Sequence, residues 1–530
     1  MLPRRVEVLA ALAWAFWAAL AHCEASGGVV KLPDDFIVGS GTSSYQAEGA
    51  WNVSGKGESL FDRILHSSAL TGVPNADVGA DSYHRSKDDV AAARELKLRM
   101  YRFSLSWPRL LPNGWTSNVN QDGLRYYNQL IDDLQDSGIQ PMVTLFHWDA
   151  PQALQDEFDG WNDDKMVDAF VAYADFAFTH FGDRVRYWTT HNEPYLFCNF
   201  LPNIAAFLAG TEIPDTAPTP APGQEANDYK CLQRIVLSHA RAYRLYQEKY
   251  AAKQHGLIGL SNFAFAPRPN SSSFADVAAV RRYNLLTLGT TFGPLVTGDY
   301  PVEVRRMVDE ASEREGLGKS RLPEFSADQR AMLRGTIDFL GVNNYFGQTI
   351  AAAKRPERGS ALTDAAVRVV ANDVFGSHAV TAFSQMTPWS LKEAALWCWA
   401  EYRVPIFVTE NGFITENSVV SLDDNIRAVY HSAYMRELVR GIEEDGVRVL
   451  GYLAWSLIDL FEWVRQYKYS YGLVHVDYAG GSLNRTLKKS SAFFKEVGET
   501  RTIPEVAASS ARFSSSLLPV FAGLILLKCL

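Results

Sequence analysis

The chain has 530 residues, of which 47% are hydrophobic and 12% aromatic, so it can bury a large core and lacks the composition of a disordered protein. Its formal net charge is −9 at pH 7, and no cluster of lysine or arginine stands out, so we expect no nucleic acid partner. The length allows two or three domains or one large barrel.

The N-terminus has the pattern of a secretory signal peptide. Arg4 and Arg5 precede an apolar run over 8–21, and small and polar residues follow. The run is too short for a comfortable membrane span. We therefore expect residues 1–25 to be a signal peptide cleaved between Cys23 and Ser26, and the mature chain to enter an oxidising compartment.

Apolar runs with strand character alternate with helical patterns along the mature chain. The eight runs are 36–45, 100–103, 140–146, 185–190, 257–265, 336–343, 406–409 and 450–455. Apolar residues recur at helical spacing over 126–135, 165–181, 392–402 and 425–443. This alternation predicts an α/β fold, a single (β/α)8 TIM barrel with long βα loops over residues 26–505. A doubly wound sheet is the alternative.

Two of these runs end in a carboxylate. The run Ile-Phe-Val-Thr at 406–409 leads into Glu410 and Gly412, and the run at 185–190 leads to Asn192, Glu193 and Pro194. A single carboxylate at a strand end is more often part of a structural ion pair. Active sites of (β/α)8 barrels lie at the C-terminal ends of the strands, so two such carboxylates indicate acid/base chemistry.

The other residues at these strand ends are amides, aromatic rings, one imidazole and further charged groups. This mixture is typical of a site for a polyhydroxylated ring, because aromatic faces cover its C–H surface and polar groups bind its hydroxyls. The residues are Gln46, Glu48, Arg102, His147, Trp148, Asn343, Tyr345, Trp455, Glu462 and Trp463.

The C-terminal segment 506–530 resembles the signal for a GPI anchor. Small residues at 507–511 are followed by a short polar spacer and an almost wholly apolar tail over 517–530. The alternative is a poorly ordered apolar tail on a secreted protein.

Three of the five cysteines lie outside the terminal segments that we expect to be removed: Cys198, Cys231 and Cys398. An odd number allows one disulfide and one buried thiol. We expect Cys198 to pair with Cys231, because both lie in the long insert that follows the strand-end carboxylate Glu193.

Three glycosylation sequons begin at Asn52, Asn270 and Asn484, which fits secretion. The spacing of a zinc site, the glycine motifs of dinucleotide and phosphate loops, and the nucleophile elbow of serine hydrolases do not occur. No metal and no organic cofactor is therefore expected.

From about residue 32 to 494 the sequence resembles glycoside hydrolase family 1, the β-glucosidase family. Residues 36–49, Phe-Ile-Val-Gly-Ser-Gly-Thr-Ser-Ser-Tyr-Gln-Ala-Glu-Gly, resemble its N-terminal signature. Residues 189–194 resemble its acid/base motif and residues 408–412 its nucleophile motif. Further matches, such as Trp-Ser-Leu-Ile-Asp-Leu-Phe-Glu-Trp at 455–463, occur in the order of the family.

The resemblance implies that Glu410 is the nucleophile and Glu193 the acid/base of a retaining β-glycosidase, with Arg102 and Tyr345 holding Glu410 ionised and oriented. It implies a substrate-binding role for Gln46, His147, Asn192, Asn343, Trp455, Glu462 and Trp463. Three positions depart from the family: Leu460 stands where the family usually has Asn, Phe383 lies where a tryptophan commonly floors the aglycone site, and Tyr471 replaces a common phenylalanine.

Three functions stay open at this point. The first is a secreted or cell-surface β-glucosidase that releases glucosyl, and also galactosyl or fucosyl, residues from disaccharides or aryl glycosides. The second is a thioglucosidase that acts on glucosinolates. The third is a non-catalytic sugar-binding co-receptor of the same fold. The expected partner is a small glycoside, a GPI lipid would hold the chain at a membrane, and the oligomeric state is open.

Overall fold

The computed structural model describes residues 29–200, 204, 227–371, 386–417 and 422–506. The expected signal peptide, the expected GPI-anchor signal from residue 507 onward and Phe383 lie outside the described residues.

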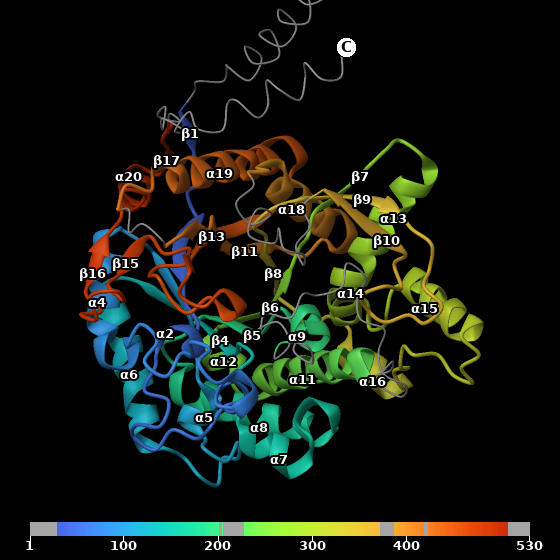
Figure 1. Cartoon of the computed structure of the whole chain (residues 1–530), viewed down its shortest axis with the longest axis horizontal. Coiled ribbons are helices and arrows are strands. Elements are labelled where there is room, and N and C mark those ends of the chain that lie inside the picture. Colours follow the sequence, from blue (N-terminus) through green and yellow to red (C-terminus); the bar gives the residue numbers. More distant parts are fainter. Residues whose placement is uncertain (1–28, 201–203, 205–226, 372–385, 418–421, 507–530) are drawn as a thin grey trace, which may run out of the picture.

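Eight parallel strands close into a barrel (Figure 1). Chain order is also spatial order, and the last strand pairs with the first. The predicted (β/α)8 barrel is confirmed, and the doubly wound alternative is wrong. The strands are β2 (Ile37–Gly41), β3 (Met100–Ser104), β4 (Gln140–Phe146), β5 (Tyr187–Asn192), β6 (Leu257–Phe263), β8 (Phe339–Asn343), β11 (Ile406–Asn411) and β13 (Val449–Trp455).

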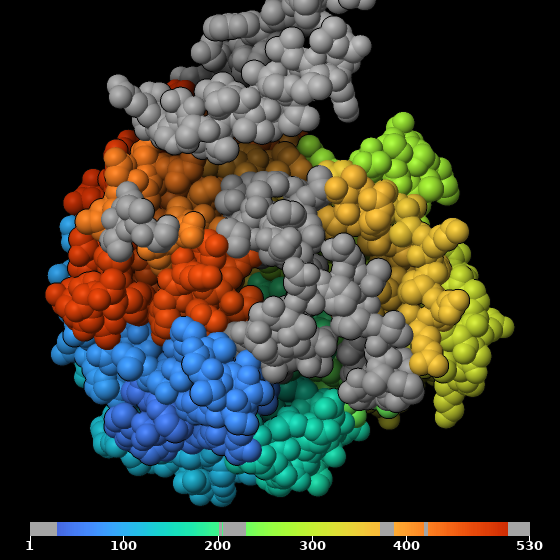
Figure 2. All heavy atoms as spheres, in the orientation of Figure 1, coloured from blue at the N-terminus to red at the C-terminus, as the bar shows by residue number. Residues whose placement is uncertain are grey.

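Barrel closure brings the two ends of the chain together. Residues 37–41 of β2 pair in register with residues 451–455 of β13. In the space-filling view, the blue N-terminal and the red C-terminal parts of the chain adjoin on one face (Figure 2). The run predicted over 36–45 yields only the short strand β2, because the helix α2 (Ser44–Ala47) begins soon after it.

The barrel interior is filled by side chains. Five strands each contribute one buried residue to a cluster that is separate from the main core, as expected for a packed small barrel. These residues are Met100, Met142, Phe339, Phe407 and Leu453.

Amphipathic helices surround the barrel. The helix α6 (Gln121–Asp136) buries Tyr127, Leu130, Ile131 and Leu134, which recur at helical spacing and therefore face the core. The helix predicted over 165–181 is confirmed at both ends. The other main helices are α4 (Ser82–Glu95), α8 (Lys165–Phe181), α11 (Asn227–Lys249), α13 (Phe274–Asn284), α14 (Thr290–Thr297), α15 (Val302–Arg314), α18 (Trp389–Tyr402), α19 (Asn425–Asp445) and α20 (Ser491–Thr500).

Long βα loops carry additional small elements. One is a three-stranded sheet of β7 (Pro267–Pro269), β9 (Gln348–Ala352) and β10 (Val367–Ala371). In another loop, Cys198 of α9 (Pro194–Phe200) and Cys231 of α11 form a disulfide with an S–S distance of 2.02 Å, the pair expected from the sequence. Cys398 is a buried free thiol.

The turn after β11 requires a glycine. A Cβ atom at Gly412 would lie 2.1 Å from the carbonyl oxygen of Trp455 and 3.1 Å from Cδ1 of Tyr471. The end of the strand that carries Glu410 can therefore approach the end of β13 only because Gly412 has no side chain.

We expect Gly412→Ala to lower the free energy of unfolding by about 1 to 3 kcal/mol, because the added methyl group meets backbone that cannot move aside cheaply. The matched control is Gly318→Ala, whose Cβ would have no atom within 4 Å. Thermal unfolding of both variants checks this. Equal melting temperatures for the two would contradict the close approach.

Candidate active site

Glu410, the last residue but one of β11, is buried between two hydrogen-bond donors. Nη1 of Arg102 on β3 lies 2.5 Å from Oε1 of Glu410, and the hydroxyl of Tyr345 donates to Oε2 at 2.7 Å. Each carboxylate oxygen is thereby held by a different element, one by Arg102 within β3 and the other by Tyr345 in the loop after β8. The guanidinium also supplies the opposite charge that a buried carboxylate needs.

Arg102 is itself fixed by further acceptors. Its Nη2 donates to Oδ1 of Asn192 at 2.8 Å, and its Nε donates to the hydroxyl of Thr144 on β4 at 3.0 Å. The side chain is fully buried, so these bonds compensate for the water that it has lost. The cation is therefore locked in one orientation toward Glu410.

Glu193 follows β5 directly and has a left-handed backbone, with φ of 48°. Its N–H donates to the carbonyl of Ser261 on β6 at 2.8 Å, and its Oε1 accepts from Nδ2 of Asn343 at 2.7 Å. Burial, together with the negative charge of Glu410, raises the pKa of Glu193 to about 8, although the bond from Asn343 opposes this. Glu193 is therefore protonated at neutral pH while its neighbour is paired with a cation.

Asn343, at the end of β8, connects the two carboxyl groups. Its Nδ2 also lies 3.1 Å from Oδ1 of Asn192, which accepts from Arg102, and its own Oδ1 accepts from the hydroxyl of Thr409 at 2.6 Å. A short hydrogen-bonded path thus runs from Glu193 to Glu410. The structure brings together all four residues that the sequence placed in the catalytic set, namely Arg102, Glu193, Tyr345 and Glu410.

His147, just after β4, lies beside this path. Since Oδ1 of Asn192 accepts from Arg102, its Nδ2 is the donor to Nε2 of His147, at 3.2 Å. Burial and the nearby charge of Arg102 hold the pKa of His147 well below its ordinary value, so the ring is neutral and carries its proton on Nδ1. That Nδ1 is buried without a partner among the described residues, which leaves a donor for a ligand.

Glu462 precedes the short helix η5 (Trp463–Arg465) and is also buried. Its Oε1 has no hydrogen-bond partner among the described residues, and burial raises the pKa of this carboxyl well above its ordinary value. A buried carboxyl oxygen of this kind calls for a hydroxyl partner. Trp455 and Trp463 stack with the His147 ring, with centroids 5.9 and 6.3 Å away, and supply the apolar faces.

Gln46 on α2 lies next to this group. Its Oε1 accepts from the hydroxyl of Ser43 at 2.8 Å, and its Nε2 donates to the carbonyl of Phe461 at 2.7 Å. Gln46 therefore holds the segment that leads to Glu462. Of the residues predicted to bind substrate, Phe383 alone lies outside the described residues.

Several residues behind the site were not predicted from the sequence. The hydroxyls of Tyr430 and Tyr434, one helical turn apart on α19, both donate to the carbonyl of Tyr345, at 2.6 and 3.0 Å. Asn411 donates to the carbonyl of Asn344 and accepts from Tyr452, both at 2.5 Å. The i, i+4 spacing of the two α19 tyrosines is the one signal that the sequence offered for this support.

Comparisons with known proteins agree with this geometry. The sequence model of Glycosyl hydrolase family 1 matches residues 29–503. Myrosinase 1 of Brevicoryne brassicae is 36% identical over 475 residues, which cover 89% of this chain and 99% of that protein. Lactase/phlorizin hydrolase of Homo sapiens is 37% identical over 476 residues, which cover 89% of this chain but 24% of that protein, so this chain spans about a quarter of its length.

A solved structure of a rice β-glucosidase variant, described as a covalent complex with Glc, matches with a TM-score of 0.78 and 33% identity, and the match covers 88% of this chain and 99% of that one. The family match extends over nearly all the described residues and includes both carboxyl groups of the site. The chain belongs to glycosyl hydrolase family 1, a family of retaining β-glycosidases.

Proposed function

We propose that the protein is a β-glucosidase that removes terminal β-glucosyl residues from disaccharides or aryl glycosides with retention of configuration. The observation that carries the proposal is the pair of buried carboxyl groups at two strand ends, Glu410 ion-paired with Arg102 and Glu193 hydrogen-bonded to Asn343, whose burial and proximity raise the pKa of Glu193. A retaining glycosidase needs one carboxylate to attack and one carboxylic acid to protonate the leaving group.

In the first step, the Glu410 carboxylate attacks the anomeric carbon and the bond from that carbon to the leaving oxygen breaks. Glu193 gives its proton to this oxygen, so the aglycone leaves as a neutral alcohol. The product is a glycosyl ester on Glu410. Its formation removes the negative charge that adds to the effect of burial in raising the pKa of Glu193, so Glu193, which has given up its proton, is a stronger acid than in the free enzyme.

In the second step, the ionised Glu193 takes a proton from a water molecule. The water oxygen bonds to the anomeric carbon, and the bond to Glu410 breaks, which restores the carboxylate beside Arg102. Two inversions give net retention. Arg102 and Tyr345 stabilise the carboxylate that departs in this step, because they already donate to its two oxygens.

The sugar-binding roles rest on the unsatisfied polar groups. Nδ1 of His147 is a donor, and neither it nor Oε1 of Glu462 has a partner within the part of the chain that the structure describes, so each can bind a ring hydroxyl. We assign Asn192, which accepts from Arg102 and Asn343, to the 2-hydroxyl, whose contacts strengthen in the transition state. Trp455 offers a flat face for the C–H surface of the sugar.

A thioglucosidase is the second candidate, and the match to Myrosinase 1 of Brevicoryne brassicae favours it. A thiolate leaves with little acid assistance, so the acid Glu193 is permitted there but not required. Comparison of kcat/KM for an aryl O-glucoside and a glucosinolate separates the two. We expect the O-glucoside to be preferred, because Glu193 is protonated at neutral pH.

We also propose that the protein is secreted or attached to the cell surface through a GPI lipid. The N-terminal and C-terminal sequence patterns support this, and so do the exposed positions of the sequons at Asn52, Asn270 and Asn484. Among the described residues, no helix is long and apolar enough to cross a membrane.

Glu410→Gln should lower kcat/KM for an aryl β-glucoside by at least about 10⁴-fold, because an amide cannot form the glycosyl ester. Glu193→Gln should cost about 10² to 10⁴-fold on substrates with poor leaving groups and less on activated ones. The exposed Glu499→Gln on α20 is the control and should behave as wild type. Steady-state kinetics checks this, and near wild-type rates for Glu410→Gln would exclude it as the nucleophile.

The pH dependence follows from the raised pKa of Glu193, which is about 8 in the free enzyme. The acid form is required, so kcat/KM should be constant through neutral pH and fall as the pH rises through about 8. A pH profile of kcat/KM with an unactivated glucoside measures this. Full activity well above pH 9 would contradict the assignment of Glu193 as the acid.

A phospholipase that cuts GPI anchors should release the protein from cells that express the full chain. A chain that ends at Val506 lacks the expected signal and should appear in the medium without the enzyme. Immunoblots of cells and medium distinguish these results. Protein that stays on the cells after phospholipase treatment would count against the anchor.

A further inference from the structure

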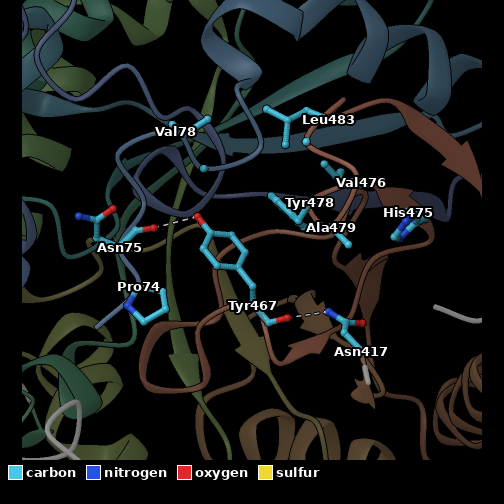
Figure 3. Close-up of a pocket in the computed structure, with 12 residues that line it drawn as sticks. Pro74, Asn75, Val78, Asn417, Tyr467, His475, Val476, Tyr478, Ala479 and Leu483 are labelled. Atoms are coloured by element: carbon cyan, nitrogen blue, oxygen red, sulfur yellow. Dashed lines mark hydrogen bonds between the residues drawn. The ribbon is translucent and has the colours of Figure 1, made fainter. Parts of the chain in front are cut away.

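A second pocket, outside the proposed active site, lies between the N-terminal and C-terminal parts of the chain. It has a volume of about 640 Å³ and is lined by residues within 74–79 and 467–483, together with Asn417. Volumes of this size hold small organic ligands. Figure 3 shows Tyr467 between Asn75 and Asn417, with a hydrogen bond to each.

The walls of the pocket are largely apolar. Pro74, Val78, Val476 and Leu483 contribute aliphatic surface, and Val78 remains 58% exposed. Among the described residues that line the pocket there is no Lys, Arg, Asp or Glu. A ligand of this pocket should therefore be uncharged and should have an apolar face.

The pocket also presents tyrosine rings and a fixed set of polar groups. The rings of Tyr467 and Tyr478 pack with centroids 4.6 Å apart, and the hydroxyl of Tyr478 donates to the backbone carbonyl of Asp459 at 2.8 Å. The aromatic wall is therefore anchored. The amides of Asn75 and Asn417 lie in the same lining.

His475 also lines the pocket, and a hydrogen bond to Asp459 fixes the orientation of its ring. Burial opposes ionisation of Asp459, but the charge of Lys488 at 2.6 Å lowers the pKa of this carboxyl below its ordinary value, so it is ionised. Nδ1 of His475 lies 3.1 Å from Oδ2 of Asp459 and donates to it. Nε2 of His475 is left to bind a hydroxyl.

We infer that this pocket binds a saccharide ring, with an apolar face of the ring against the tyrosines and its hydroxyls on His475 and the two asparagines. A sugar is the neutral ligand that combines one apolar face with hydroxyl groups around its edge. Two sources of such a ring exist. One is a free sugar in solution, and the other is an N-linked glycan on Asn484, which is exposed and follows the lining residue Leu483.

The pocket is connected through Tyr467 and Phe461 to Gln46, one of the residues predicted to bind substrate. The Tyr467 ring packs on Phe461 at 5.5 Å, and the Phe461 carbonyl accepts from Gln46. Glu462 follows Phe461 in the chain. The Tyr467 ring therefore lies between the pocket and the segment that presents Glu462 and Trp463.

The test measures binding of methyl β-D-glucoside by calorimetry or saturation-transfer NMR, with unglycosylated protein whose active site is first blocked by a 2-deoxy-2-fluoroglucosyl fluoride. We expect saturable binding to wild type that is at least about tenfold weaker in Val78→Trp, because the indole fills the pocket. Val277→Trp is the matched control, since Val277 is 50% exposed on α13 and is not part of the lining.

No binding to blocked wild type, or equal binding to the Val78→Trp and Val277→Trp variants, would overturn the inference. The same measurement on glycosylated protein identifies the source of the sugar ring. If the glycosylated protein binds free sugar only after Asn484→Gln, the N-linked glycan occupies the pocket. If it binds free sugar without that change, the ligand is a free sugar. If the inhibitor does not label the protein, the proposed function is contradicted but the inference about the pocket is not. The comparison of the two tryptophan variants still measures whether the sugar binds in the pocket.

Discussion

The site depends on one buried negative charge and on how it is compensated. A carboxylate that is removed from water loses hydration free energy of several kcal/mol. The ion pair between Arg102 and Glu410 compensates for this loss because further hydrogen bonds fix both partners. Tyr345 holds the second oxygen of Glu410, and Asn192 and Thr144 hold the guanidinium. A second buried charge beside the first would have the Asn343 amide as its hydrogen-bond donor but no ion pair of its own. Burial, and then the charge of Glu410, therefore raise the pKa of Glu193, so that Glu193 keeps its proton.

The barrel makes this arrangement possible because it delivers one or two residues from each strand end to the same place. Arg102, Asn192, Asn343 and Glu410 belong to β3, β5, β8 and β11, and each is the partner of another. Parallel pairing fixes their heights along the barrel axis. Gly412 then lets the end of β11 approach the end of β13, which places Trp455 near the same group.

The sequence could predict the eight strands because each is an apolar run long enough to be buried on both faces, as β4 and β11 are. It could also predict the two carboxylates, since an acidic residue directly after a buried apolar strand needs either an ion pair or a catalytic role. It could not predict that Tyr430 and Tyr434 support Tyr345, because that contact depends on how α19 docks on the barrel. The second pocket was missed for the same reason: its two sides lie nearly 400 residues apart in the chain, and closure of β13 on β2 brings them together.

The proposed mechanism requires a covalent bond between Glu410 and the sugar. The direct measurement is mass spectrometry of the protein after reaction with a 2-deoxy-2-fluoroglucosyl fluoride, whose fluorine at C2 slows the oxocarbenium-like transition states while the fluoride leaving group still allows the first step. We predict a mass gain of one fluorosugar per chain, located by peptide mapping on Glu410. A label on another residue, or no label on a protein that hydrolyses glucosides, would contradict the assignment of Glu410 as the nucleophile.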